Sequence, residues 1–292
     1  MTAAAFALVL TSAVMHATWN FLLKRSGHKQ AFYWLMCGLS LLFVAAPAVA
    51  FAIIDGFSWT ALWLGFGTAC IHGVYAYTLT RGYDLGDLSS VYPIARGIAP
   101  ALVPILAVLI FSEHVSAIAV GGIALVVIGI YASNIDRRFL RDISHPLRAM
   151  ATPATGLALL TGLVIASYTL WDKAAIDEDV NPVTVNGFAM LGNFVFLAPF
   201  AILRVGRETL LEEWRERGRS IAVASVLAPL GYTLVLVALT TSRVSYVAPA
   251  REVGIVLGAA LGVFVLHEGY GTSRIWGAAL IVVGCLTLGV AP

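Results

Sequence analysis

The sequence predicts an all-α integral membrane protein with ten transmembrane helices, which form two inverted five-helix repeats. Three observations support this fold class: the composition, the number of long apolar runs and an internal repeat. Of the 292 residues, 60% are hydrophobic and 12% are charged, with a mean hydropathy of +0.89. Soluble globular domains are about half apolar and about a quarter charged, so this composition indicates a chain that resides in lipid.

Ten segments are long and apolar enough for a membrane helix, which needs about 20 residues to cross the hydrocarbon core. Helices are favoured because lipid offers no partners to backbone N–H and C=O groups. The opening MTAAAFALVL has no basic residue before its apolar run, so we expect a permanent span rather than a cleaved signal peptide. The predicted spans are residues 3–23, 31–54, 60–81, 88–111, 117–134, 153–172, 182–203, 220–241, 245–266 and 273–291.

The connections between the predicted spans are short, and the longest are residues 135–152 and 204–219. In the second of these, Leu210, Leu211 and Trp214 share one helical face and charged residues occupy the other. This pattern fits a short helix that lies in the membrane interface. A solvated loop fits it equally well.

The chain contains an internal repeat. The stretch LTSAVMHATWNFLLK at 10–24 matches LLTGLVIASYTLWDK at 159–173, with an offset of 149 residues. Further along the chain the offset is 155, and it stays constant over paired residues of unusual type. These pairs are Arg96 with Arg251, Glu113 with Glu268, Gly122 with Gly277, and Gly129 with Gly284.

The repeat divides the chain into residues 1–150 and residues 151–292, each with five predicted spans. Because five is odd, the second repeat enters the membrane from the opposite side. Inverted repeats are typical of transporters that alternate access around a site near the bilayer midplane. Within each half the two glycines lie seven residues apart, Gly122 and Gly129 in the first and Gly277 and Gly284 in the second. We interpret each set as a helix-packing face.

The basic residues fix a predicted orientation. Fourteen of them lie in the odd-numbered connections and two, Lys173 and Arg243, in the even-numbered ones. Connections rich in Lys and Arg remain in the cytoplasm, so both termini are expected outside the cytoplasmic (inner) membrane. The fourteen are Lys24, Arg25, Lys29, Arg81, Arg137, Arg138, Arg141, Arg148, Arg204, Arg207, Arg215, Arg217, Arg219 and Arg274.

These features resemble the drug/metabolite transporter superfamily, in its EamA family. The resemblance rests on the ten spans, the repeat, and an arginine-bearing fourth span that leads to Ser112-Glu113-His114, echoed by His267-Glu268-Gly269. The step Tyr92-Pro93 resembles the YddG-type amino-acid exporters, and the stretch HATWN resembles EamA members associated with phosphonate use. The resemblance implies a basket of ten helices around a central cavity, and efflux of small metabolites. Family members often have cytoplasmic termini, and here the charges predict the reverse.

Polar and aromatic side chains inside the spans are the candidate substrate-binding residues. Polar groups within a membrane helix turn towards a cavity or a neighbouring helix, and the sequence leaves both roles open. His72 and the carboxylate of Glu252 are the candidates for proton coupling. The substrate-binding candidates are His16, Trp19, Asn20, His72, Tyr75, Tyr77, Tyr92, Arg96, Tyr168, Trp171, Tyr232 and Arg251.

Arg96 and Arg251 are the most informative of these candidates, because an arginine at the membrane centre costs at least about 2.5–3.5 kcal/mol. Glu252 is the acidic residue expected at their depth, and one carboxylate cannot neutralise two arginines. The other arginine is left to a carbonyl, to water or to a substrate carboxylate, which a guanidinium grips with two hydrogen bonds. Arg96 shares a face with Ser89 and Tyr92, so we expect it to bind the carboxylate. A purely structural arginine is the alternative.

Proline and glycine mark candidate hinges in the fourth and ninth spans. Proline removes a backbone donor and tends to kink a helix. Small residues four apart permit close helix approach, so we expect these two spans to be neighbours. Glu113 and Glu268 lie at span ends, where capping or a role in loop structure is expected rather than coupling. The hinge and packing candidates are Pro93, Pro100, Pro104, Pro249, Gly254, Gly258 and Gly262.

The leading functional hypothesis is a secondary transporter that exports small metabolites, most of all amino acids, with broad specificity. The alternatives are phosphonates, sugar phosphates or drugs as cargo and, remotely, an intramembrane enzyme, although the sequence has no HExxH or GxSxG motif. We expect no enzymatic activity, cofactor, metal or nucleic-acid partner. Cys37, Cys70 and Cys285 are expected to be small apolar residues. The oligomeric state is open, with a monomer expected.

Overall fold

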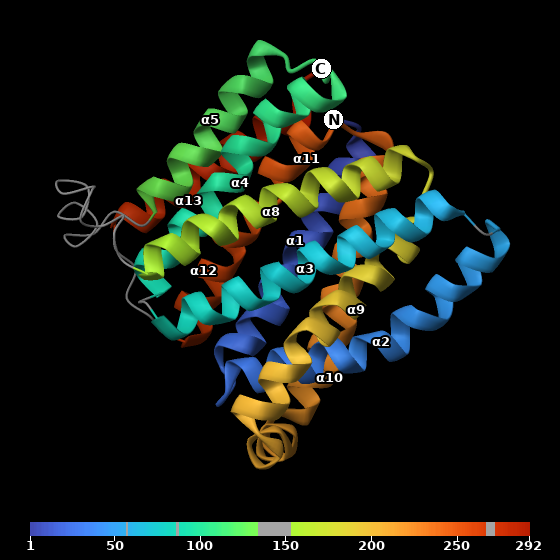
Figure 1. The fold of residues 1–292 in the computed structure, drawn as a ribbon. Coiled ribbons are helices and arrows are strands. Elements are labelled where there is room, and N and C mark those ends of the chain that lie inside the picture. Colours follow the sequence, from blue (N-terminus) through green and yellow to red (C-terminus); the bar gives the residue numbers. More distant parts are fainter. Residues whose placement is uncertain (57, 86–87, 134–152, 267–271) are drawn as a thin grey trace.

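The computed structural model describes residues 1–56, 58–85, 88–133, 153–266 and 272–292, and within its helices it leaves out the side chains at 80, 82–95, 154–155, 262–266, 272 and 274. The regular structure of the described residues is entirely helical (Figure 1). In chain order the helices are α1 (Ala3–Lys24), α2 (Lys29–Ile54), α3 (Trp59–Leu85), α4 (Leu88–Phe111), α5 (Ala117–Ala132), α8 (Pro153–Asp177), α9 (Pro182–Phe200), the π-helical turn η1 (Ala201–Val205), α10 (Arg207–Thr241), α11 (Val244–Ala250), α12 (Val253–Leu266) and α13 (Thr272–Val290).

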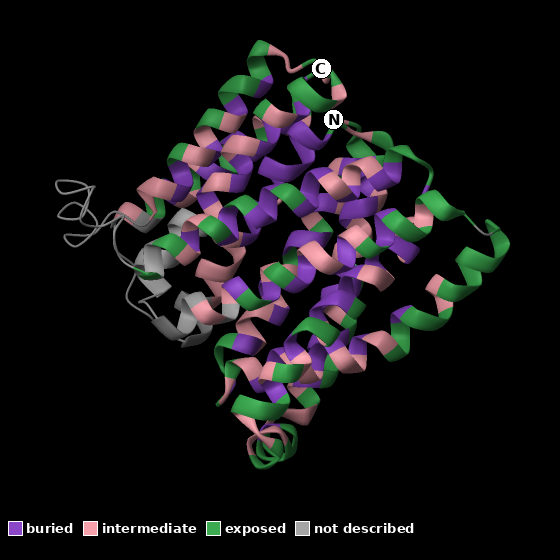
Figure 2. Ribbon diagram, in the orientation of Figure 1, coloured by how far each residue is buried: buried purple, intermediate pink, exposed green. Residues whose placement is uncertain are grey.

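The surface of the molecule is apolar, as expected of a multi-pass membrane protein. Leu42, Ile54 and Leu203 are 72%, 76% and 80% exposed, and residues with exposed side chains lie along the outer faces of the helices (Figure 2). Among the described residues, six segments are long and apolar enough to cross a membrane, and three shorter helices are also apolar. The six are Ala3–Lys24, Lys29–Ile54, Gly156–Asp177, Pro182–Val205, Arg207–Thr241 and Val244–Leu261; the three are Arg96–Phe111, Ala117–Ala132 and Ile275–Val290.

Helices from the two halves of the chain pack against each other in matching pairs. In the predicted repeat, α1 corresponds to α8 and α3 corresponds to α10. Helix α1 packs along α10, and α8 packs along α3. Helix α2 packs on α9, and α5 packs on α13 (Figure 1). Each half therefore completes its core with helices of the other half.

Four glycines bring α5 and α13 into backbone contact. A Cβ atom on Gly284 would lie 2.7 Å from the carbonyl oxygen of Gly122, and one on Gly129 would lie 2.8 Å from the carbonyl oxygen of Gly277. Neither backbone carbonyl can move aside without moving its helix, so these positions require glycine. The prediction that the two glycine pairs form packing faces is confirmed.

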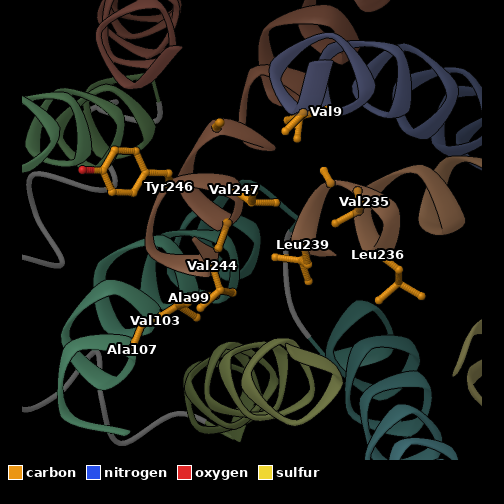
Figure 3. Packing of buried hydrophobic residues seen from close by; sticks show 14 of the residues in the cluster. Val9, Ala99, Val103, Ala107, Val235, Leu236, Leu239, Val244, Tyr246 and Val247 are labelled. Atoms are coloured by element: carbon orange, nitrogen blue, oxygen red, sulfur yellow. The ribbon is translucent and has the colours of Figure 1, made fainter. Parts of the chain in front are cut away.

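The fourth and ninth predicted spans do meet, but not through the glycines. Ala99, Val103 and Ala107 of α4 lie beside Val244 and Val247 of α11 (Figure 3). Gly254, in the following helix, instead faces Ala13 of α1 with ordinary contacts, and nothing lies within 4 Å of a Cβ on Gly258. The prediction of close approach at Gly254 and Gly258 was therefore wrong, and Gly262 lies outside the described side chains.

Several helix boundaries differ from the sequence prediction. Helix α8 continues to Asp177, one turn beyond the predicted end, and the ninth span is two helices, separated at Arg251. Residues 207–219, expected to form a separate interfacial helix or a loop, are the first part of the 35-residue helix α10. This part is attached to the segment before α2, because the buried side chain of Glu213 accepts a hydrogen bond from the backbone N–H of His28 at 2.7 Å.

The two chain ends lie at the same end of the molecule (Figure 1). The amino group of Met1 donates a hydrogen bond to the carbonyl oxygen of Ala291 at 3.0 Å. The hydroxyl of Tyr246 donates to the carbonyl oxygen of Pro292 at 2.7 Å. This arrangement is the one that an even number of spans requires.

Candidate functional site

A buried carboxylate at Asp172 of α8 gathers polar side chains from two other helices, α3 and α10. The side chain is fully inaccessible to solvent. One of its oxygens accepts a hydrogen bond from the hydroxyl of Thr68 on α3 at 2.7 Å, and the other lies 3.1 Å from Nε2 of His72, one turn further along α3. The hydroxyl of Tyr232 on α10 donates to the same oxygen. Several donors on one carboxylate are the arrangement that a buried charge needs.

Tyrosine rings surround the imidazole of His72. The ring centroid of Tyr168 lies 4.3 Å away, that of Tyr232 5.4 Å and that of Tyr75 6.4 Å. Because Tyr168 precedes Asp172 by four residues on α8, both project from the same helix face.

A second group of charges lies where α4, α1 and the α11–α12 segment meet. Nε of Arg96 lies 3.4 Å from a carboxylate oxygen of Glu252, and both side chains are largely buried. Nη2 of Arg96 lies 3.5 Å from Nε2 of His16 on α1. Arg96 therefore has a carboxylate partner within the protein, which reduces its availability for an anionic cargo.

Arg251 has a different environment from its repeat-mate. It lies at the break between α11 and α12, where the backbone N–H of Glu252 donates to the carbonyl of Pro249 and that of Gly254 donates to the carbonyl of Arg251, both at 3.1 Å. The guanidinium carbon lies 5.6 Å from the ring centroid of Tyr232. Within the described part of the chain, Arg251 forms no ion pair with a carboxylate.

Tyr232 connects the two groups. Its hydroxyl binds Asp172, and its ring lies beneath the guanidinium of Arg251. The described residues of this region include two arginines and two carboxylates. Their net formal charge is therefore zero when His16 and His72 are neutral. An added carboxylate or proton would disturb this balance in a medium that screens charge weakly.

The structure brings most of the predicted site residues together. His72, Tyr75, Tyr168 and Tyr232 lie around Asp172, while His16, Arg96, Arg251 and Glu252 lie around the helix break. The side chain of Tyr92 lies outside the described residues, as does that of Pro93. Pro100 and Pro104 are buried in α4, which remains one helix through both of them, and Pro249 is buried in α11.

Four predicted site residues make other contacts. Trp19 is buried in an apolar cluster with Tyr33, and its ring centroid also lies 5.0 Å from that of His16, at the edge of the site. The amide of Asn20 donates to the carbonyl of His16 in its own helix at 2.8 Å. The indole N–H of Trp171 donates to the carbonyl of Leu64 at 2.8 Å, which joins α8 to α3. Tyr77 is 49% exposed. Sequence spacing placed these residues on the correct helices, but it does not fix how each helix is rotated.

Asp172 is not among the site residues that the sequence predicts. It occupies the last position of the predicted span 153–172, where a carboxylate would reach water. The structure extends α8 by a further turn, so Asp172 is inside the helix and fully buried. The spacing of four residues between Tyr168 and Asp172 was the available signal.

Glu113 has a capping role, as its position at a span end predicted. Its carboxylate accepts hydrogen bonds from the backbone N–H groups of Val244 and Ser245, at 2.9 and 3.0 Å, and from the hydroxyl of Ser245. These groups begin α11, and a carboxylate there satisfies donors that have no partner within the helix. Its repeat-mate Glu268 lies outside the described residues.

Comparison with known proteins supports the resemblance seen in the sequence. The model of the EamA-like transporter family matches residues 152–290, just under half of the chain. A solved structure described as "Crystal structure of protein" superposes with a TM-score of 0.74 at 15% identity, covering 98% of this chain and 96% of that chain. At this identity the likeness shows a shared fold. No curated protein sequence matches the chain. The family that matches this part of the chain is one of membrane transporters.

Proposed function

We propose that this protein is a secondary transporter that exports small zwitterionic metabolites, most of all amino acids, across the cytoplasmic membrane. In this proposal residues 1–150 and 151–292 form two inverted five-helix repeats, which alternate access around the break between α11 and α12. Both termini lie outside.

The arrangement of the helices supports the mechanism. The pairing of α1 with α10 corresponds to that of α8 with α3, as expected if a twofold axis relates the halves. Transporters of this kind place their cargo near the midplane, at helices that are interrupted there. The interruption at Arg251 and Glu252 has this character, because backbone groups at a broken helix are tolerated in a membrane where they face a site rather than lipid.

The observation that carries the cargo assignment is the difference between the two arginines. Glu252 neutralises Arg96, whereas Arg251 lies over an aromatic ring with no carboxylate partner among the described residues. A guanidinium in this environment is suited to a cargo carboxylate, which it can hold with two parallel hydrogen bonds. The sequence favoured Arg96 for this role, and the ion pair to Glu252 makes Arg251 the better candidate.

The surrounding side chains support an organic cargo of moderate size. Tyr168, Tyr232 and His72 offer aromatic faces and hydroxyl groups beside Arg251, which suits cargoes with different side chains. Sugar phosphates and phosphonates are the second class of cargo. They carry more negative charge than one guanidinium without a carboxylate partner can balance.

Counterflow in proteoliposomes tests the proposal. Vesicles that contain the purified protein are loaded with one L-amino acid from a panel, and uptake of the labelled amino acid is measured for wild type, Arg251→Ala and a control, Arg243→Ala. Arg243 lies at the chain ends, where it contacts Pro292. We expect wild type and Arg243→Ala to show counterflow and Arg251→Ala to lose it. Absence of counterflow for every amino acid would overturn the cargo class, and normal counterflow by folded Arg251→Ala would overturn the role of Arg251.

Fusions at Pro292 test the orientation. A phosphatase fused there should be active because an external C-terminus carries it out of the cytoplasm. Fluorescence from a GFP fusion at the same position would contradict the proposed orientation, since GFP folds inside.

A further inference from the structure

The side chain of Asp172 is fully buried, and its ion-pair partner is a residue whose charge depends on protonation. In the described part of the chain, that partner is His72, which is charged only when protonated. Thr68 and Tyr232 stabilise the carboxylate with neutral hydroxyl groups. A buried carboxylate whose compensating charge can be removed by deprotonation is a site where one proton changes the local charge.

We propose that Asp172 and His72 form a proton-binding site and that Tyr232 couples its occupancy to binding of the cargo carboxylate at Arg251. The cargo part of this inference rests on the proposed function, whereas the proton-binding part does not. In one state the imidazole of His72 is neutral and the pair carries one negative charge. In the other, the imidazole has accepted a proton and the pair is neutral.

Charge balance sets the direction of the coupling. With His72 neutral, the carboxylates of Asp172 and Glu252 balance the guanidinium groups of Arg96 and Arg251. A cargo carboxylate at Arg251 adds one negative charge, and proton uptake at His72 removes it again. The proton and the cargo carboxylate therefore favour each other's binding, by the same factor in each direction.

Tyr232 is the physical link between the two sites. Its hydroxyl donates to Asp172 while its ring lies 5.6 Å from the guanidinium carbon of Arg251, so both sites depend on the position of one side chain. When Asp172 is not compensated by a charged His72, its negative charge attracts Arg251 across this ring. Protonation of His72 weakens that attraction and leaves Arg251 available to cargo.

The other ionisable groups around the pair do not replace it. Tyr75 and Tyr168 present aromatic rings to His72. Glu252, the carboxylate favoured for coupling from the sequence, lies 3.4 Å from the permanently charged Arg96. Arg96 is permanently charged, whereas His72, the ion-pair partner of Asp172, is charged only when protonated. His16 also contacts Arg96, which disfavours a second positive charge there.

Co-binding has a consequence for transport. Protons and cargo would cross together, so net flux would follow the sum of their gradients. Export would then require an outward cargo gradient larger than the inward proton gradient, and exchange of one cargo for another would need no net proton movement.

The first test measures protons without any cargo. Full-length protein in detergent is titrated between about pH 8 and pH 5, the range in which histidine changes charge, and bound protons are counted for wild type, Asp172→Asn and Asp177→Asn. Asp177 lies on the same helix, with a side chain 45% exposed. We expect Asp172→Asn to bind about one proton fewer than wild type in this range, because His72 loses its anionic partner, and Asp177→Asn to match wild type. Equal proton counts for folded Asp172→Asn and wild type would overturn the proton site.

The second test measures the coupling in proteoliposomes, with L-phenylalanine as the probe and pyranine inside the vesicles. We expect an inward proton gradient to increase phenylalanine uptake and phenylalanine entry to carry protons inward. Tyr232→Phe keeps the ring beneath Arg251 and the carboxylate of Asp172, so it should fold and bind the proton but lose at least half of the gradient effect. Stimulation by sodium instead of protons, or full proton stimulation in Tyr232→Phe, would overturn the coupling. If no amino acid counterflows, the cargo proposal and this coupling fail together, and the proton count still decides the site at Asp172.

Discussion

Helix α4 and the α11–α12 segment occupy matching places in the internal repeat, yet they differ in backbone and in chemistry. Helix α4 is continuous from Leu88 to Phe111 and its Arg96 is paired with a carboxylate. The α11–α12 segment is interrupted at Arg251, whose guanidinium lies over a tyrosine ring. The carboxylate that neutralises Arg96 belongs to Glu252, in the other segment.

This difference shows how a repeat can keep one fold and divide its functions. The matching positions hold the same residue type, but Glu252 corresponds to Gly97 and therefore has no counterpart in the first half. One added carboxylate pairs with Arg96, and in the proposed transporter this leaves Arg251 for cargo. The four predictions below test that division, in order of decreasing effect.

The largest effect is expected from loss of the carboxylate that joins the two segments. Glu252→Gln should lower the free energy of unfolding by about 3–5 kcal/mol, because it leaves the buried charge of Arg96 without compensation. Denaturant titration in detergent measures this. The double variant Arg96→Gln with Glu252→Gln should recover much of the loss, since it removes both charges. If the double variant is no more stable than Glu252→Gln, the ion pair is not what holds the segments together.

A smaller loss is expected where α11 begins. Glu113→Gln should lower stability by about 1–2 kcal/mol, because the carboxylate that accepts from the N–H groups of Val244 and Ser245 loses its charge. Hydrogen exchange should increase in α11 more than in α4. The matched control is Glu178→Gln, at an exposed position after α8, which should change neither quantity. Unchanged exchange in α11 would contradict a capping role for Glu113.

Replacement of each arginine by lysine should separate their roles. Arg251→Lys keeps the charge but loses the planar fork, so the half-saturation concentration for amino-acid counterflow should rise about tenfold, or about 1.4 kcal/mol. Arg96→Lys should affect thermal stability more than half-saturation, because its partner is Glu252. Equal changes of the half-saturation concentration in both variants would show that both arginines contribute to cargo binding.

The smallest effect is expected at a glycine of α12. Gly258→Ala should be neutral or stabilise by up to about 1 kcal/mol, because nothing lies within 4 Å of the added Cβ and alanine favours a helix. Gly284→Ala is the contrasting variant, since its Cβ would lie 2.7 Å from the carbonyl oxygen of Gly122, and it should clearly destabilise. A destabilised Gly258→Ala would mean that α12 packs closely in another state of the transport cycle.

Several elements of the fold could be predicted because their cause is local. A run of apolar residues about 20 long has one stable conformation in lipid, and the helices α1, α2, α4 and α13 follow their predicted boundaries to within two residues. The paired glycines of α5 and α13 were also identified correctly, because a spacing of seven places them on one helix face.

The candidate site was predictable in part. An arginine within an apolar span is recognisable by its cost, so Arg96 and Arg251 stood out in the sequence alone. The partner of each arginine was not predictable, because Arg96 and Glu252 are far apart in sequence and meet only once α4 and α11 are packed. Asp172 was missed for a related reason: burial depends on what surrounds a position, and α3 and α10 supply that environment.

The sequence by itself determined that this chain is a membrane protein of long apolar helices, since composition and spacing act over one helix at a time. Tertiary structure decided which side chains share a site. It directed Trp19 and Trp171 into packing, paired Arg96 with Glu252, and enclosed Asp172 with His72 and Tyr232. The physical reason is that the rotation and register of one helix against another depend on the sum of many contacts, none of which is visible in a single segment.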